Sequence, residues 1–140
     1  MSRVLLGAVV LVASFTAAGC DDATLPAGPS LPSAPVLTEN FSGTLTINGA
    51  ITHPFVVITS GTVTATLVTV SPDAEVPVGM SIGTWNQTTQ SCAIVIANDL
   101  ALQGRILFGT AQNSGAFCVR MYDVGRLTAA SDYEVVVSHQ

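Results

Sequence analysis

The stretch Thr62–Leu67 reads TVTATL and decides the fold class of this chain. Its apolar residues Val63, Ala65 and Leu67 alternate with threonines, which places them together on one face of an extended segment. Alternation with a period of two is typical of a β-strand that buries one face and exposes the other. The stretch therefore predicts one strand of a layered β-protein.

The same texture continues along the rest of the chain. Runs rich in β-branched residues are separated about every 8 to 12 residues by turn signals, which is typical of an antiparallel all-β domain. We expect eight strands, at Phe41–Ile47, His53–Ile58, Thr62–Val70, Val78–Thr84, Ala93–Ala97, Gln103–Thr110, Ala116–Tyr122 and Tyr133–His139. Two sheets packed face to face would bury the apolar stripes, so the sequence predicts an antiparallel two-sheet β-sandwich, jelly-roll-like. One helical turn over Asn98–Leu102 is left open.

The N-terminal segment has the composition of an export signal. Arg3 supplies a positive charge, Val4–Phe15 is apolar, and small residues lead directly into Cys20. The apolar run is shorter than the about 20 residues that a membrane-spanning helix needs. The segment resembles a bacterial lipoprotein signal, which implies cleavage before Cys20 and lipid attachment to its thiol, although Ala17 stands where leucine is usual. An ordinary secretory signal followed by a chance cysteine is the alternative.

The next segment is rich in proline. Residues 21–36 read DDATLPAGPSLPSAPV, with four prolines in ten residues, a composition that forms neither a helix nor a sheet ladder. Such an extended spacer can hold a folded domain on the order of 50 Å from a membrane. The sequence thus predicts a signal peptide over 1–19, a lipidated cysteine and proline-rich tether over 20–37, and a β-sandwich domain over 38–140.

Charge and export together limit the partners. Charged residues make up 9% of the chain, and after Cys20 three arginines oppose nine carboxylates, a formal charge of −6 with no lysine. Nucleic acids recruit clusters of Lys and Arg, so no nucleic-acid partner is expected. The expected partners are the lipid bilayer, through acylated Cys20, and an envelope protein or polysaccharide. The expected location is the bacterial cell envelope, facing the periplasm or at the cell surface.

Cys92 and Cys118 are the two cysteines that remain when Cys20 carries lipid. An even pair in an exported, oxidising setting indicates a disulfide. The bridge would close a loop of about 27 residues, worth about 3.5 kcal/mol by loop entropy. Zinc binding is the alternative, but no histidine or third cysteine lies at ligand spacing. We therefore predict the disulfide, with no metal and no cofactor.

Groups for catalysis are scarce. His53 precedes Pro54, which favours extended backbone, and His139 is the penultimate residue, where fraying is expected. The chain lacks the G-x-S-x-G and H-E-x-x-H motifs and a glycine-rich phosphate loop. A Ser-His-Asp set assembled from distant residues, as in a small hydrolase, is the alternative.

The carboxylates are dispersed along the chain. Asp73 and Glu75 lie in a proline-bounded loop, where they could contribute to a calcium site but are explained by ordinary solvation. Asp123, two residues before Gly125, is explained as a turn residue that accepts hydrogen bonds from its own backbone.

Trp85 is the single tryptophan and stands where a predicted strand gives way to a polar loop. An aromatic face beside the amides of Asn86 and Gln87 is a usual means of binding a sugar ring. A tryptophan at a strand end can instead pack over the edge of the core, which is the interpretation we prefer. Trp85, Asn86 and Gln87 are therefore the candidate ligand-binding residues.

Four segments together resemble a known family. They read HPFVVITSGTVTATLVTVSP at 53–72, VGMSIGTWN at 78–86, SGAFCVRMYDVGRL at 114–127 and SDYEVVVSH at 131–139. These segments resemble the bacterial pre-peptidase C-terminal domain, with a match covering roughly residues 39–140. The most specific piece is Ser114–Asp123, which is similar to the family's Gly-x-aromatic-x-Val strand and following turn.

The resemblance implies a small β-sandwich of the kind appended to secreted peptidases and also found alone in exported proteins. Some relatives bind calcium through an acidic cluster near the start of the domain. In this chain Glu39 and Asn40 alone stand there, so the calcium site does not carry over.

Together these features predict a non-catalytic, lipid-anchored envelope protein that acts as a binding or structural accessory module. A carbohydrate-binding lipoprotein that uses the Trp85 loop is the first alternative, and a small hydrolase is the second.

Overall fold

The computed structural model describes residues 33–140, and each regular element in that range is a β-strand. The strands are β1 (Leu37–Leu45), β2 (Ala50–Val57), β3 (Gly61–Ser71), β4 (Val78–Asn86), β5 (Ser91–Ala101), β6 (Ile106–Ala111), β7 (Gly115–Tyr122) and β8 (Ser131–His139). This part of the chain contains no helix that could cross a membrane.

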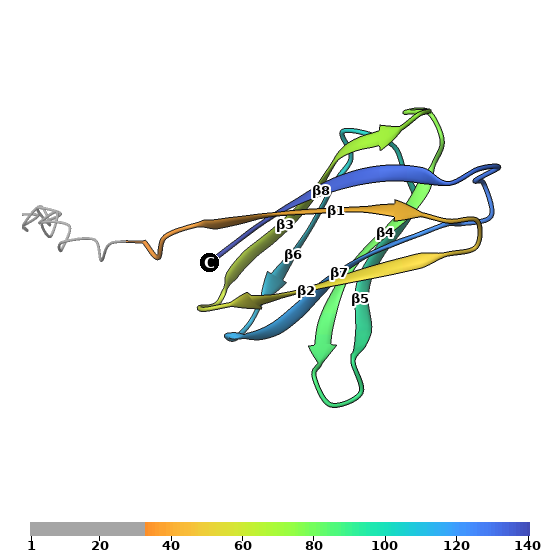
Figure 1. Ribbon diagram of the computed structural model, residues 1–140. Coiled ribbons are helices and arrows are strands. Elements are labelled where there is room, and N and C mark those ends of the chain that lie inside the picture. Colours follow the sequence, from red (N-terminus) through yellow and green to blue (C-terminus); the bar gives the residue numbers. More distant parts are fainter. Residues whose placement is uncertain (1–32) are drawn as a thin grey trace, which may run out of the picture. The chain divides into compact units, whose positions relative to one another are not determined.

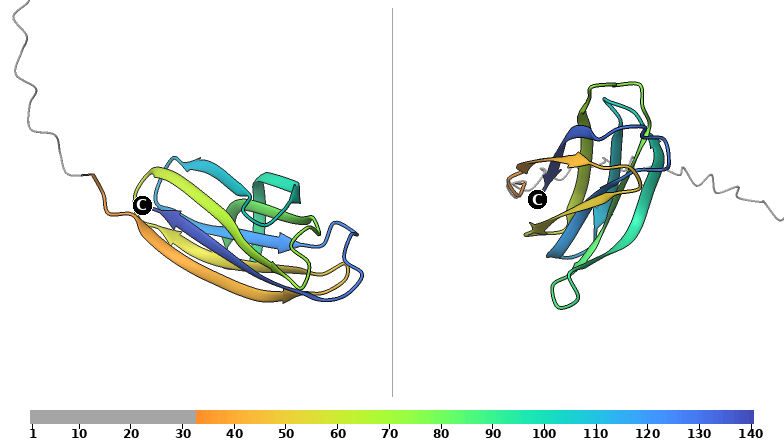
Figure 2. Two further views of the ribbon diagram at one scale, coloured as in Figure 1. Left: turned by 90° about the horizontal axis from the view of Figure 1, so that it is seen from above. Right: turned by 45° about the vertical axis from the view of Figure 1, so that its right-hand side comes forward.

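The strands form two antiparallel sheets of four. The first sheet has the order β1-β8-β3-β6 and the second β2-β7-β4-β5 (Figure 1). The pairs β1–β8, β2–β7, β3–β6 and β4–β5 are nested like the arms of one long hairpin, with its tip between β4 and β5. All connections except the one between β4 and β5 cross from one sheet to the other, so the hairpin rolls up into two layers (Figure 2). This is the jelly-roll order, and the predicted eight-stranded β-sandwich is confirmed.

The core forms where the apolar stripes of the two sheets meet. Val63, Ala65 and Leu67 of β3 are all buried, while the threonines between them face away from the core, as the alternation predicts. Met80 and Met121 face them from the second sheet and are also buried. Each large side chain buried in this way stabilises the fold by about 1.5–3 kcal/mol.

The structure corrects several expected boundaries. The helical turn left open over Asn98–Leu102 is wrong, because β5 continues as a strand to Ala101 and pairs there with Val78. The strand expected from Gln103 begins three residues later, since residues 102–105 form the turn that leads into β6. Gly104 takes a left-handed backbone in this turn (φ 83°), which a glycine adopts without strain.

The first strand starts at Leu37, four residues earlier than expected, because β1 pairs with β8 along its whole length. The predicted signal peptide over 1–19, Cys20 and the tether as far as residue 32 lie outside the described residues.

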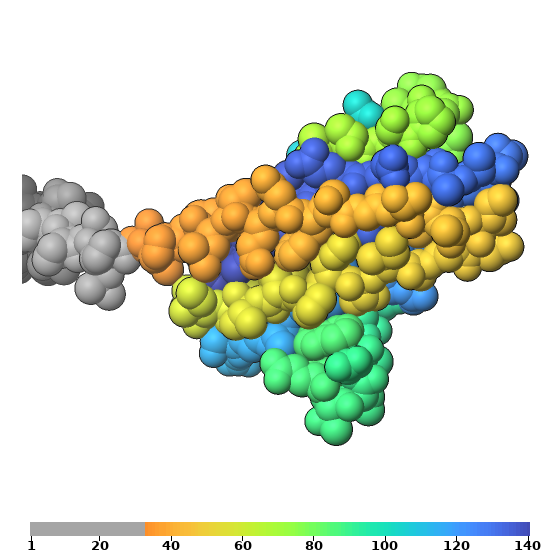
Figure 3. Space-filling view, viewed as in Figure 1, coloured from red at the N-terminus to blue at the C-terminus, as the bar shows by residue number. Residues whose placement is uncertain are grey.

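The two long edges of the sandwich differ. On one side the edge strands β1 and β2 are joined by the short turn at residues 46–49 and lie side by side (Figures 1 and 3). We call this the closed side. On the other side the edge strands are β6 and β5, joined at one end by residues 102–105, and a pocket opens between the layers beyond that turn. We call this the open side.

Candidate functional site

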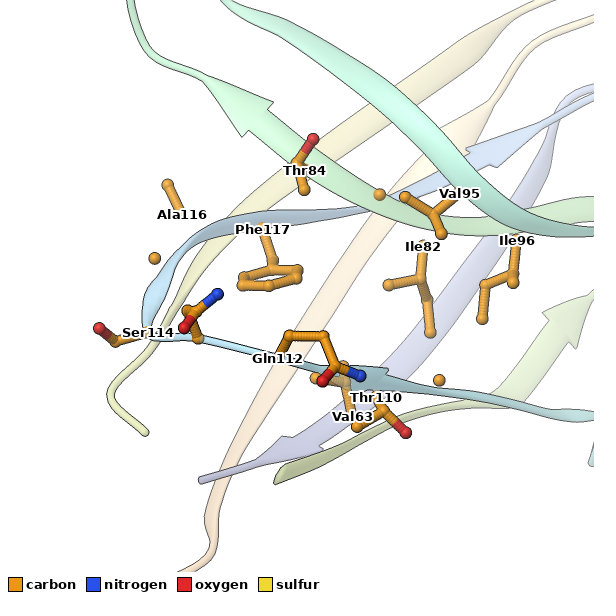
Figure 4. A pocket seen from close by; sticks show the side chains of 14 residues that line it. Val63, Ile82, Thr84, Val95, Ile96, Thr110, Gln112, Ser114, Ala116 and Phe117 are labelled. Carbon is orange, nitrogen blue, oxygen red and sulfur yellow. The ribbon is translucent and has the colours of Figure 1, made fainter. Parts of the chain in front are cut away.

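An apolar pocket of about 440 Å³ opens between the two sheets on the open side. Figure 4 shows Ile82, Ile96 and Phe117 pointing into it from the second sheet, with Val63 of the first sheet opposite. Cavities of about 300 to 1,000 Å³ with mainly apolar walls are the usual size of small-molecule sites in proteins. The pocket is therefore large enough to hold a ring or a short aliphatic chain.

The rim of the pocket is polar but carries no charged side chain. Thr110, Gln112, Asn113 and Ser114 contribute hydroxyl and amide groups from the end of β6 and the turn that follows it. Hydroxyls and amides both donate and accept hydrogen bonds. Burying an unpaired charge against the apolar walls would be costly. The lining of the pocket is therefore chemically suited to an uncharged group with an apolar body.

Two local features open the layers at this point. A side chain at Gly109 would crowd the pocket, because a Cβ atom there would lie 3.0 Å from the Cδ1 atom of Ile96. The pairing of β5 with β4 shifts register between Ile94 and Ile96, so Val95 has no partner in β4. Val95 is consequently 70% exposed while still lining the pocket.

The predicted disulfide between Cys92 and Cys118 is confirmed. The sulfur atoms are 2.09 Å apart and the Cα atoms 6.0 Å apart, inside the usual range for such bridges. The bond joins the start of β5 to β7 across β4, which requires β5 to pass close over β4. Gly83 permits this approach, because a Cβ atom there would lie 2.2 Å from the carbonyl oxygen of Ala93.

Trp85 lies near the end of β4, where it pairs with Cys92 and is partly buried. Among the described residues it belongs neither to the hydrophobic core nor to the lining of the pocket, so it is not the core-edge residue that we preferred. Asn86 Oδ1 accepts hydrogen bonds from the backbone N–H groups of Thr88 and Thr89, at 2.9 and 3.1 Å. The three candidate residues thus share one hairpin, with the Asn86 carbonyl held by the turn and Gln87 exposed.

On the closed side, His53 of β2 bridges the two sheets. Its ring stacks on Phe41 of β1 with centroids 5.0 Å apart, and its Nε2 atom is hydrogen-bonded to the Tyr133 hydroxyl of β8 at 2.7 Å. Burial lowers the pKa of His53 and raises the pKa of Tyr133 to about 12. Both groups are therefore neutral at neutral pH, and they act here as packing groups.

The fraying expected at His139 is wrong. The residue is 1% exposed, because β8 pairs there with Leu37 at the start of β1. Its Nε2 atom lies 2.9 Å from Glu39 Oε1, and its Nδ1 atom has no hydrogen-bond partner in the described part of the chain. Within residues 33–140 neither His53 nor His139 is hydrogen-bonded to a serine or threonine hydroxyl.

Asp123 is a turn residue, as predicted, and it also joins two loops. Its Oδ1 atom accepts hydrogen bonds from the N–H groups of Gly125, Arg126 and Leu127, and its Oδ2 atom accepts one from the N–H of Asn48, in the β1–β2 turn. Although desolvation opposes ionisation, these four hydrogen bonds outweigh it and lower the pKa of Asp123. The carboxylate therefore clamps the turn of the closed side to the β7–β8 loop.

The loop acids show no metal-binding arrangement. Asp73 Oδ1 accepts a hydrogen bond from the N–H of Glu75, which is a local turn contact. Across residues 33–140, no three His, Cys, Asp and Glu side chains are grouped so as to hold a metal ion.

Sequence reasoning did not single out the pocket. Its walls come from five strands, and wall residues such as Val63 and Ile82 also fit the pattern of an ordinary core strand. The neutral turn QNSG at residues 112–115 is the one local hint, because uncharged polar side chains gather there at the end of a strand.

No known family model matches the sequence, and a search of curated proteins likewise finds no match. Function is therefore inferred from the chemistry of the pocket itself.

Proposed function

We propose that this chain is a non-catalytic, lipid-anchored protein of the bacterial envelope, and that its pocket on the open side binds an uncharged, mainly apolar group of a ligand. The observation that carries the proposal is the lining of the pocket. Aliphatic and aromatic walls supply apolar contact, and the uncharged rim supplies hydrogen bonds that orient what enters.

Binding without turnover is supported by what surrounds the pocket. Acyl-transfer chemistry needs a nucleophile within hydrogen-bond reach of a base. Ser114 is the one serine in the lining, and no histidine, carboxylate or lysine lines the pocket with it. Both histidines are engaged elsewhere, because His53 is hydrogen-bonded to Tyr133 and His139 to Glu39.

The expected affinity follows from the area that the pocket can cover. An aromatic group that buries about 150 Å² gains about 4 kcal/mol at 25 cal/mol per Å², which corresponds to a Kd on the order of 1 mM. Hydrogen bonds from the rim, at about 1 kcal/mol each, would lower this Kd toward the micromolar range.

The membrane anchor is supported by the N-terminal sequence. A small-residue box leads into Cys20, and about 16 residues separate this cysteine from the start of β1 at Leu37. A proline-rich spacer of that length reaches on the order of 50 Å, enough to present the domain beyond the lipid headgroups. The resemblance to the pre-peptidase C-terminal domain supports an accessory role of the same kind.

The pocket is tested by fluorescence titration with N-phenyl-1-naphthylamine, a neutral apolar fluorophore. We expect saturable binding to the folded protein and about a tenfold loss of affinity in Val95→Asp, because a carboxylate at the pocket wall opposes apolar binding. The matched control is Ile94→Asp, since Ile94 is a neighbouring exposed residue that does not line the pocket. Equal losses in the two variants, or no saturable binding, would contradict the proposal.

Carbohydrate binding by Trp85, Asn86 and Gln87 is a second candidate. It is favoured by one observation, that Trp85 packs neither in the core nor in the pocket while exposed Gln87 lies beside it. Since Trp85 is the single tryptophan, its fluorescence should change when soluble peptidoglycan or capsule fragments bind. An unchanged spectrum at saturating fragment concentration would exclude this use of the hairpin for those sugars.

A further inference from the structure

β6 exposes large apolar side chains at the edge of the first sheet. Its residues Ile106–Ala111 read ILFGTA and carry no charge. Phe108 is 71% exposed and Ile106 is 54% exposed. An edge strand of this composition is a template for pairing with another strand.

The other three edge strands carry features that discourage such pairing. β1 lies beside β2 on the closed side, and β2 contains Pro54, which lacks a backbone donor. β5 contains two register shifts against β4 and the charged residue Asp99. Bulges, prolines and charges are the usual means of protecting an edge. β6 has none of them, and it pairs with β3 without a register shift.

The backbone of β6 leaves a defined set of groups for a further strand. The N–H of Leu67 donates to the carbonyl of Arg105 at 2.9 Å, at the end of the β3–β6 ladder. Along an antiparallel ladder every second residue is hydrogen-bonded to the same neighbouring strand. Since Arg105 is bonded to β3, Leu107 and the other odd-numbered residues of β6 also direct their N–H and C=O groups toward β3. Ile106, Phe108 and Thr110 therefore direct their N–H and C=O groups to the open edge.

We propose that a second copy of this chain pairs with β6 through its own β6, antiparallel and about a two-fold axis beside Phe108. In that register Phe108 lies opposite Phe108 of the second copy, and Ile106 lies opposite Thr110 of the second copy. The outward N–H and C=O groups of all three residues are then paired with each other. The two first sheets become one continuous sheet, with the two phenylalanine rings in contact on its outer face.

A second copy suits this edge better than a foreign strand because the register is self-complementary. A C2 interface requires that one patch pairs with itself, and this strand does so without placing like charges opposite each other. Ile106–Ala111 carries no charge in an otherwise acidic chain, and Arg105, just before it, would lie opposite Ala111 of the second copy.

The exposed apolar surface around β6 sets the expected strength. Ile106 and Phe108 are the two large apolar side chains of β6 that each copy brings to the contact. At roughly 100 Å² each, the two copies bury about 400 Å² of apolar side-chain surface, which is below the about 1,000 Å² of a stable specific interface. The pairing is therefore weak between free copies. A shared membrane raises the effective concentration of the copies and thereby favours the paired state, so the inference rests on the proposed lipid anchor.

The test uses the full chain in the membranes of the cells that express it, with Phe108→Cys. Opposed Cα atoms in a hydrogen-bonded antiparallel pair are about 5.5 Å apart, within the range of a disulfide. We expect a disulfide-linked dimer on non-reducing gels, at least about fivefold more abundant than with Thr64→Cys. Thr64 pairs with Phe108 across the β3–β6 ladder, one strand further from the edge, so it is the matched control. This control also measures any dimer formed through Cys20.

A charge variant supplies a readout without a new cysteine. In Phe108→Lys two ammonium groups would face each other, so capture of a differently tagged second copy should fall several-fold. Val56→Lys is the control, because Val56 is similarly exposed on β2. Equal capture by the two variants would overturn the proposal. So would crosslinking of Phe108→Cys to a different protein, or no more dimer than with Thr64→Cys.

Partition into detergent keeps the two proposals separate. A chain that remains in the membrane fraction without the Phe108→Cys dimer overturns the pairing and leaves the anchor intact. A chain that forms the dimer but partitions into the aqueous phase overturns the anchor and leaves the pairing intact.

Discussion

The closed and open sides of the sandwich fill the space between the same two sheets in different ways. On the closed side, the His53 ring of the second sheet stacks on Phe41 and meets Tyr133 edge to face, and both of these belong to the first sheet. On the open side, Ile82, Ile96 and Phe117 leave a pocket of about 440 Å³. The comparison teaches that ring packing and hydrogen bonds fill the space between the sheets on the closed side, around the titratable His53 and Tyr133. The pocket on the open side has no charged side chain in its lining, and it is therefore suited to an uncharged ligand group.

The physical cause lies in how the chain joins the edge strands. On the closed side a short turn connects β1 to β2, and Asp123 clamps that turn to the β7–β8 loop. On the open side β6 lacks a side chain at Gly109, and the register shift at Val95 lets β5 depart from β4. Ligand sites are commonly clefts lined by apolar side chains with a few polar groups, which is the composition of this pocket.

The largest expected effect is loss of the disulfide on the open side. Replacing both Cys92 and Cys118 by alanine should lower the free energy of unfolding by about 3.5 kcal/mol, because the unfolded chain is no longer constrained. Urea unfolding measures the loss. Hydrogen exchange should show faster opening of β5 than of β1, since the bond holds the start of β5 to β7. Equal acceleration of hydrogen exchange in β5 and β1 would contradict the view that the disulfide stabilises the open side in particular.

The next effect is on the closed side. Asp123→Ala removes the acceptor for four backbone N–H groups and should lower the free energy of unfolding by about 2 kcal/mol. Asp123→Asn is the control, because its amide oxygen can still accept from Gly125, Arg126 and Leu127. We expect the free energy of unfolding of Asp123→Asn to fall by less than half as much as that of Asp123→Ala. An equal fall in the two variants would argue against the clamp.

The same carboxylate predicts an acid dependence. The pKa of Asp123 is lower in the folded protein than its ordinary value of 3.8. Its contribution to stability is therefore fully present above about pH 4 and is lost as the pH falls through the folded pKa. Acid titration of the wild type and Asp123→Asn, followed by circular dichroism, should show a smaller loss of stability in the variant.

A smaller effect should come from His53. Burial lowers its pKa in the folded protein below the ordinary value of 6.5, so the unfolded chain takes up the proton first. The contribution of His53 is present above about pH 6.5 and declines as the pH falls toward the folded pKa. Thermal unfolding between pH 8 and pH 5 should show this decline, and His53→Gln should flatten it. A slope that survives in His53→Gln would assign the titration to another group.

The smallest effect on the folded domain is expected for Cys20→Ser. The variant should move from the detergent phase to the aqueous phase, because a chain without acyl groups has no membrane anchor. The free energy of unfolding should change by less than about 0.5 kcal/mol, since Cys20 is not one of the residues 33–140 that form the two sheets. Equal detergent partition of the variant and the wild type would rule out the lipid anchor.

Local sequence was sufficient for the class of fold and for the disulfide. The TVTATL stretch predicts a half-buried strand because alternation of side chains is a property of one extended segment. The pairing of Cys92 with Cys118 was predicted from the two cysteines that remain when Cys20 is taken to carry lipid, and from the oxidising setting that export would imply. The turn role of Asp123 was also predictable, since the side chain accepts from N–H groups two to four residues ahead.

Tertiary structure decided the placement of the functional groups. His139 is buried because β8 pairs with β1, a contact across about 100 residues of sequence that no local pattern reports. Trp85 is outside the hydrophobic core because it lies near the tip of the β4–β5 hairpin, where it pairs with Cys92. The pocket depends on a missing side chain at Gly109 and a one-residue shift at Val95, which take effect when five strands meet. Periodicity determines which face of a strand is apolar, whereas the pairing of distant strands determines which apolar face stays open.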